Sequence, residues 1–172
     1  VSQAYESLNL AATDTLCRHF LLPYFHKWQL QESEIGLHII NRPSPDCVEL
    51  VLNKEAQLAV VNDYEGLRDN PQLEVTTLAT IQDVFVGGPD YKGAGFFDQG
   101  RLLNEPILLL HKGSASRTFF DDVTHGACRK PRFELGSVDV LLDLVEINMG
   151  ISMLPNHVVQ QKMQEGTIVR ID

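Results

Sequence analysis

The chain has 172 residues, enough for one large domain or two small lobes, and its 44% hydrophobic and 22% charged residues are ordinary for a globular protein. Its formal net charge of −9 disfavours a surface that binds nucleic acid, which would be basic. No apolar run approaches the ~20 residues of a membrane span. Three widely separated cysteines argue against a disulfide framework and fit a reducing cytoplasm.

The first third of the chain alternates between strand and helix patterns. Strands are predicted at 8–10, 35–40 and 58–61, and helices at 16–25 and 47–52. Thr13, Asp14 and Thr15 stand at the first strand-to-helix junction, where a side-chain oxygen can cap the helix. Strands and helices in this order predict right-handed βαβ units with a parallel sheet.

The stretch from Leu73 to Gly88 is extended and too long for one ordinary strand. We therefore predict two strands with a break at 80–82, where the chain crosses into a second lobe. A glycine-rich loop follows at 89–100.

The second half repeats the pattern of the first. Strands are predicted at 106–110, 132–135, 151–155 and 167–171, and helices at 99–103, 117–123, 140–147 and 157–164, the last capped by Asn156. Polar turns follow these strands, and ligands of open α/β sheets bind beyond the carboxyl ends of strands. The sequence therefore predicts ligand binding at the polar turns, in the cleft between two lobes.

Four segments carry a resemblance to a known family. They are Leu10 to Thr15 with the Leu21-Leu22-Pro23 helix, Ser44 to Val60, Pro106 to Leu109, and Leu144 to Pro155, the last resembling "V-x-x-G-x-G-I-x-x-L-P". Together, in this order, they resemble the effector-binding (regulatory) domain of LysR-type transcriptional regulators. Lys54, Gln57 and Asn148 depart from the family pattern of Gly, Asp and Gly.

The resemblance implies an α/β, two-lobed type 2 periplasmic-binding-protein-like fold, each lobe a mostly parallel sheet flanked by helices. It places lobe I at 1–80, lobe II at 81–166 and the start of a return to lobe I at 167–172. The family's N-terminal winged helix-turn-helix is absent from this chain.

The resemblance also implies which residues contact the effector. The effector-binding residues carried over from the family are Thr13, Asp14, Thr15, Leu16, Arg42, Ser44, Asn62, Ser114, Ser116, Arg117 and Ser137. Hydroxyls, helix N-termini and arginines suit a small carboxylate-like anion, which Arg42 or Arg117 would counter. Asp14 opposes a multiply charged anion and is suited instead to an ammonium group.

Motifs for catalysis are missing from the sequence. The six histidines show no HExxH spacing, and there is no GxSxG, P-loop or GxGxxG motif. We therefore expect no catalytic residue, no metal site and no cofactor.

The sequence favours a cytoplasmic effector-sensing domain. Such a domain would form homodimers or homotetramers through its lobes, reach DNA only through the missing N-terminal domain, and make no membrane contact. Two alternatives stay open. An extracytoplasmic solute-binding protein of the same fold would carry a signal peptide. An enzyme on a two-lobed scaffold, such as a relative of porphobilinogen deaminase or of a dehydratase, would turn over a substrate.

Overall fold

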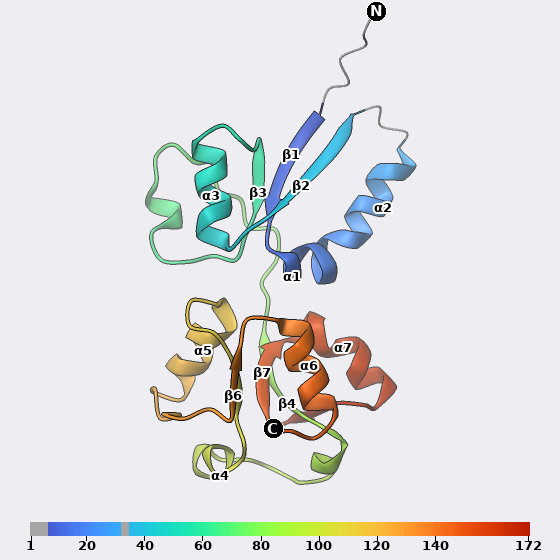
Figure 1. Cartoon of the computed structure of the whole chain (residues 1–172), viewed down its shortest axis with the longest axis vertical. Helices are drawn as coiled ribbons and strands as arrows, with labels where there is room; N and C mark the ends of the chain where they lie inside the picture. The colour runs from blue at the N-terminus through green and yellow to red at the C-terminus, as the bar shows by residue number, and fades with distance from the viewer. Residues whose placement is uncertain (1–6, 32–34) are drawn as a thin grey trace, which may run out of the picture. The chain divides into compact units, whose positions relative to one another are not determined.

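The computed structural model describes residues 7–31 and 35–172, and its contacts divide the chain into two units, Val1–Thr77 and Leu78–Asp172 (Figure 1). The first unit contains one sheet and the second unit contains two, with helices on both sides of the strands. The lobe limits expected from the sequence, at 80 and at 166, stay predictions.

The first unit is built on a parallel three-stranded sheet of order β2-β1-β3. Its elements are β1 (Ser7–Ala12), α1 (Asp14–Leu16), the π-helical turn η1 (Cys17–Leu21), α2 (Leu22–Leu30), β2 (Gly36–Asn41), α3 (Ser44–Leu52), β3 (Leu58–Val60) and the 3-10 turn η2 (Leu67–Asp69). The helix predicted at 16–25 thus begins at Asp14 and continues to Leu30.

Alternating residues of β1 pack against helices on the two faces of the sheet in this unit. Leu10 and Ala12 pack with Leu21 on one face, while Ala11 packs with Cys47 of α3 on the other. Figure 1 shows α3 on one side of the sheet and α1–α2 on the other. Since both faces are covered, polar groups that contact solvent or a ligand are left to the strand ends.

The second unit contains five described strands, and four of them run in the same direction. Its elements are β4 (Asp83–Gly87), η3 (Pro89–Tyr91), α4 (Gln99–Asn104), β5 (Leu108–Leu110), α5 (Ala115–Val123), β6 (Phe133–Leu135), α6 (Val138–Glu146), β7 (Ser152–Pro155), α7 (Asn156–Glu165) and β8 (Val169–Ile171). β4 runs antiparallel to β7 and to β8, whereas β5 and β6 are parallel and a parallel bridge joins Ile107 to Ile151. Among the described strands of this unit, only β4 is therefore reversed.

The strands of the second unit form two sheets, of order β7-β4-β8 and β5-β6, and two apolar clusters lie on opposite sides of β5. The first contains Leu108 and Leu110 with Leu141 of α6 and Val159 of α7. The second contains Leu109 of the same strand with Phe120 of α5 and Leu102 of α4. The alternation along β5 assigns α6 and α7 to one face and α4 and α5 to the other.

The prediction of two strands within 73–88 was wrong. Only Asp83–Gly87 forms a strand, and the residues from Leu73 to Gln82 have no sheet partner. Leu78 is 65% exposed, so the β-branched and apolar residues of this segment reflect an extended connection, not a buried strand. The division between the units falls inside it, after Thr77. A smaller correction concerns α7, which has Pro155 at its N-cap and includes Asn156 as a helical residue.

The core assignment predicts a sharp contrast between neighbouring residues of α6. Leu141 is fully buried and Val140 is 50% exposed. We expect Leu141→Ala to lower the free energy of unfolding by about 2–5 kcal/mol, because it leaves a cavity between α6 and the sheet. Val140→Ala is the matched control and should change it by less than about 0.5 kcal/mol. Urea unfolding monitored by circular dichroism measures both, and equal effects would contradict the assignment.

Candidate ligand-binding site

Thr13 lies directly after β1 and caps the helix that follows. Its Oγ1 accepts a hydrogen bond from the Leu16 backbone N–H at 3.1 Å, and its carbonyl oxygen accepts from the Cys17 N–H at 3.0 Å. Asp14 is exposed in the first turn and Leu16 is buried, so Leu16 offers a ligand no side-chain surface. The carboxyl end of β1 thus presents a hydroxyl and the free N–H groups of a helix start.

Arg42 lies beside Thr13 because β1 and β2 end together. The register pairs Ala12 with Asn41, and the Arg42 N–H donates to the Ala12 carbonyl oxygen at 3.4 Å. The Asn41 side chain donates to the same oxygen at 3.2 Å. The Arg42 side chain is exposed, and its Nη1 donates to the Asn41 carbonyl oxygen at 2.8 Å.

Ser44 and Asn62 are brought together at the carboxyl ends of β2 and β3. The Asn62 backbone N–H donates to Ser44 Oγ at 3.1 Å. Ser44 is the first residue of α3, whose N-cap is Pro43 without a side-chain capping bond. The Ser44 hydroxyl therefore accepts from the chain after β3, as Thr13 Oγ1 accepts from its own helix, and its hydrogen has no acceptor among the described residues.

In the second unit the predicted serines occupy helix starts after β5 and β6. Ser114 Oγ accepts from the Arg117 N–H at 3.2 Å, and Ser137 Oγ accepts from the Val140 N–H at 3.3 Å. Both are N-caps, of α5 and α6 respectively. Ser116 is buried in the first turn of α5.

Asp83 lies at the carboxyl end of β7 in the second unit, although the sequence analysis did not identify it. It begins β4 and pairs with Pro155, the last residue of β7, because these strands are antiparallel. Burial raises the pKa of the Asp83 carboxyl, and a hydrogen bond with the Ser116 side chain partly opposes that rise. The sequence shows Asp83 as an acidic residue at the start of an apolar strand. Its position beside the end of β7 depends on the reversed direction of β4, which the sequence did not predict.

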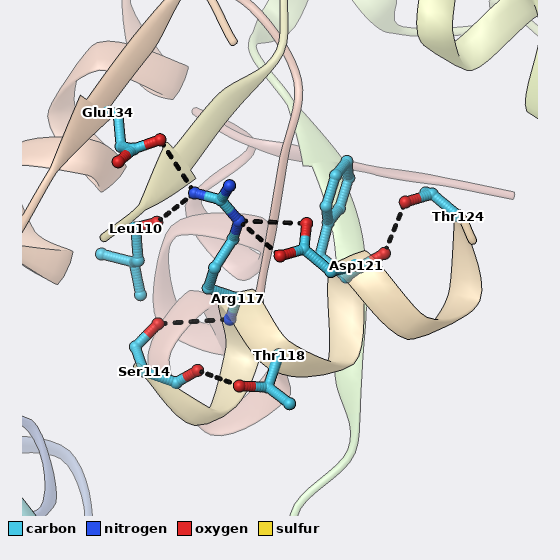
Figure 2. A network of polar contacts seen from close by, with 8 residues as sticks. Leu110, Ser114, Arg117, Thr118, Asp121, Thr124 and Glu134 are labelled. Atoms are coloured by element: carbon cyan, nitrogen blue, oxygen red, sulfur yellow. Dashed lines mark hydrogen bonds and ion pairs between the residues drawn. The ribbon is translucent and has the colours of Figure 1, made fainter. Parts of the chain in front are cut away.

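The Arg117 side chain is bound to groups of the protein, which disfavours its use for a ligand. Figure 2 shows its guanidinium surrounded by Leu110, Asp121 and Glu134. Nε donates to both carboxylate oxygens of Asp121 at 3.0 Å, and Nη1 donates to Glu134 Oε2 and to the Leu110 carbonyl oxygen, each at 3.0 Å. The side chain is 5% exposed. Two carboxylates therefore balance the one positive charge on the inner side of α5.

The described residues offer no metal site and no membrane span. No group of three or more His, Cys, Asp or Glu side chains within 7–31 and 35–172 is placed to hold a metal ion. In the same ranges, no helix has the length and apolar character needed to cross a membrane.

Two α/β units whose parallel strands end in polar helix starts define a class of small-ligand-binding proteins. The family model for the LysR substrate binding domain matches residues 3–172. The chain therefore belongs to this family, the regulatory, effector-binding domain of LysR-type transcriptional regulators, which is not an enzyme class. The family predicted from the sequence is confirmed.

Solved structures of regulatory domains share the fold. The cofactor-binding domain of the Cbl transcriptional regulator has a TM-score of 0.80 and 18% identity, over 100% of this chain and 78% of that chain. The regulatory domain of HypT from Salmonella typhimurium (apo-form) has a TM-score of 0.74 and 14% identity, over 100% of this chain and 81% of that chain. The regulatory domain of CrgA, a LysR-type regulator from Neisseria meningitidis, has a TM-score of 0.70 and 16% identity, over 96% of this chain and 80% of that chain. These likenesses confirm the periplasmic-binding-protein-like α/β fold class. No curated protein matches the sequence.

The Arg117 network predicts a stability effect that an exposed ion pair lacks. We expect Arg117→Met to lower the free energy of unfolding by about 1–3 kcal/mol, because it leaves the buried Leu110 carbonyl oxygen and two carboxylates without their donor. Arg68→Met removes the exposed Arg68–Asp63 pair and should cost less than about 0.5 kcal/mol.

The same network predicts how this difference varies with pH. The hydrogen bond from Arg117 holds the pKa of Glu134 below its ordinary value of 4.5. A lowered folded-state pKa stabilises the fold above that ordinary value, and the contribution is lost as the pH falls through the lowered one. The difference in the free energy of unfolding between wild type and Arg117→Met should therefore become smaller from pH 7 to pH 3. Urea unfolding across this range measures it, and a gap that widens would contradict the pairing.

Proposed function

We propose that this domain senses a small carboxylate-bearing metabolite, which binds at the carboxyl ends of the strands. The observation that carries the proposal is the use of Thr13 and Ser44 in the first unit. Each hydroxyl oxygen accepts a backbone N–H, at 3.1 Å in both cases, so each O–H is left to donate to a ligand oxygen. Arg42 lies on the neighbouring strand end and supplies the positive charge that a net-negative protein needs to hold an anion.

Arg42 is preferred to Arg117 as the residue that counters the ligand carboxylate. The Arg117 charge is balanced by Asp121 and Glu134, whereas the exposed Arg42 guanidinium has Asn41 as its only acceptor among the described residues. Binding a carboxylate to Arg117 would require breaking a buried network. Thr15 and Asn62 complete the proposed binding set of the first unit, and Ser114, Ser116 and Ser137 are the residues proposed in the second unit.

The proposed mechanism couples effector binding to DNA binding in a longer protein. Effector binding at the strand ends shifts the population of domain conformations. A DNA-binding domain N-terminal to this one would respond to that shift, since a net charge of −9 disfavours duplex binding by these residues themselves. Such a regulator acts in the cytoplasm. Family membership favours this reading over an extracytoplasmic solute-binding protein of the same fold.

The site predicts a graded loss of affinity. A ligand would first be identified by mass spectrometry of small molecules that co-purify with the domain. Thr15→Ala and Ser44→Ala should then weaken binding a few-fold to about tenfold, the loss expected for one hydrogen bond. Arg42→Ala should weaken it by more than about tenfold, because the lost bond is charge-assisted. Isothermal titration calorimetry measures each dissociation constant.

Two control variants separate binding from folding. Thr13→Ala also removes a helix cap, so Thr13→Ser, which keeps the hydroxyl, is its matched control and should retain affinity. Thr76→Ala changes an exposed threonine outside the site and should bind as wild type does. Unchanged affinity in the alanine variants of Thr13, Thr15 and Ser44, with the fold intact, would place the ligand elsewhere.

We also propose that the domain forms homodimers, or homotetramers, through apolar helix faces. Ile147, just after α6, is 65% exposed, and no residue of α2 is buried, with Leu30 68% exposed. Such faces are typical of surfaces that a second copy covers. Ile147→Asp should weaken self-association about tenfold in analytical ultracentrifugation. Phe96→Asp, at an exposed phenylalanine before α4, should leave it unchanged. A strictly monomeric wild-type protein at high concentration would contradict the proposal.

A further inference from the structure

The connection that leaves the first unit is held to that unit by one side chain, that of Arg68. Between Leu73 and Gln82 the chain has no sheet partner, and the contacts divide the two units after Thr77. Arg68 Nη2 donates to Thr77 Oγ1 at 3.0 Å. Among the described residues, this is the only hydrogen bond made by any residue strictly between Leu73 and Gln82. The bond therefore marks the point at which the chain leaves the first unit.

The backbone of Arg68 is fixed by the turn in which it lies. Leu67, the first residue of η2, is only 5% exposed and anchors this turn in the unit. Gly66 precedes it with φ 85°, a left-handed conformation that favours glycine. The Asp69 N–H closes the turn by donating to the Gly66 carbonyl oxygen at 3.2 Å. The Arg68 side chain therefore starts from a backbone position that the unit itself sets.

The same guanidinium contacts the ligand edge of the first unit, the carboxyl ends of its strands. Arg68 Nε donates to Asp63 Oδ2 at 3.0 Å. The residue before Asp63 is Asn62, whose N–H donates to Ser44 Oγ at 3.1 Å. One planar group thus joins Asp63 to Thr77, because the Nε and Nη donors of an arginine have fixed directions. A chain of contacts therefore runs from Ser44, in the proposed site, to the end of the unit.

We propose that Arg68 is a positioning residue that carries the effect of a ligand at Ser44 to the connection between the units. This role rests on the proposed function and adds the route by which it acts. A Ser44 hydroxyl that donates to a ligand oxygen becomes a stronger acceptor for the Asn62 N–H, because hydrogen bonds in a chain polarise one another. Ligand binding therefore holds the loop after β3 in place, keeps Asp63 against Arg68 and holds Thr77 in the first unit.

Arg68 acts locally, because its contacts lie at the surface. The side chains of Arg68 and Asp63 are 50% and 58% exposed, which is why the loss of their ion pair is expected to change the free energy of unfolding little. A short surface segment opens far more readily than a whole unit unfolds. Breaking the bond to Thr77 should therefore change how often residues 73–77 detach from the first unit, without unfolding it.

Limited proteolysis measures this detachment on the whole chain without any ligand. Endoproteinase Glu-C cuts after Glu74, three residues before Thr77, and mass spectrometry identifies the cut by the masses of the two fragments. The rate of this cut follows the fraction of molecules in which the segment is detached. Arg68→Met and Thr77→Val should each raise the rate about two- to fivefold, the effect of losing one surface hydrogen bond.

Two variants at neighbouring threonines control for side-chain shape. Thr77→Ser keeps the hydroxyl that accepts from Arg68 and should be cut at the wild-type rate. Thr76→Val places the same valine one residue earlier, at an exposed threonine, and should also be cut at the wild-type rate. A rise in Thr77→Val alone therefore reports the lost bond to Arg68.

A double variant tests whether Arg68 acts together with Ser44. Ser44→Ala removes the acceptor of the Asn62 N–H and should raise the rate of the Glu74 cut about twofold. Ser44→Ala combined with Arg68→Met should be cut no faster than Arg68→Met alone, because both changes act on one chain of contacts. Thr118→Ala removes a hydroxyl hydrogen bond in the second unit and should leave the rate unchanged.

These outcomes do not depend on the identity of the ligand. A wild-type rate in Arg68→Met or Thr77→Val, or an equal rise in Thr76→Val, overturns the role of Arg68. A double variant whose rise equals the product of the two single effects also overturns it, because Ser44 and Arg68 then act separately. Each of these results leaves the carboxylate site of the proposed function in place, since calorimetry tests that site with its own variants.

Discussion

Helices cover both faces of each sheet in this domain, and this constraint decides where a ligand can be recognised. Residues of β1 alternate between a helical layer on one side and α3 on the other, and residues of β5 alternate in the same way. Polar groups in the middle of such strands would be buried without partners. Hydroxyls, free N–H groups and charges are therefore confined to the turns, and parallel strand direction gathers those turns at one edge of each sheet.

The two arginines proposed for the effector differ in how the protein uses their charge. Of the two arginines that the family resemblance assigned to the effector, one is used inside the second unit and one is exposed at a strand end. Arg117 is enclosed by Asp121, Glu134 and the Leu110 carbonyl oxygen (Figure 2), and burial of a guanidinium is stable only with such partners. Although burial opposes its charged form, the hydrogen bonds to Glu134 and Asp121 outweigh this and raise the pKa of Arg117. Arg42 has no comparable enclosure, which leaves it for a ligand.

Local signals in the sequence placed the helix starts to within about three residues. Thr13 was identified, with Asp14 and Thr15, as a possible cap after the first strand, and the structure shows it as an N-cap, because capping depends on a residue's own neighbours. Ser114 and Ser137, named through the family resemblance, are N-caps as well. Signals that depend on distant residues were missed. Glu134 lies 17 residues from Arg117, so the loss of Arg117 to an internal network could not be seen. The residues before Asp83 carry strand-like side chains but have no partner strand, and strand partners are a tertiary property. Asp83 itself reaches the ligand edge only because β4 is reversed.

Amide hydrogen exchange tests the central claim, that a small ligand binds at the carboxyl ends of the strands. It would be measured with and without a small molecule that raises the unfolding midpoint. The account predicts slower exchange at the helix starts, at Asp14 and Thr15 in the first unit and at Ala115 and Ser116 in the second, where ligand oxygens would accept N–H groups that are free at a helix N-terminus. Slower exchange confined to the amino ends of the strands, around Leu8 and Gln57, would contradict it.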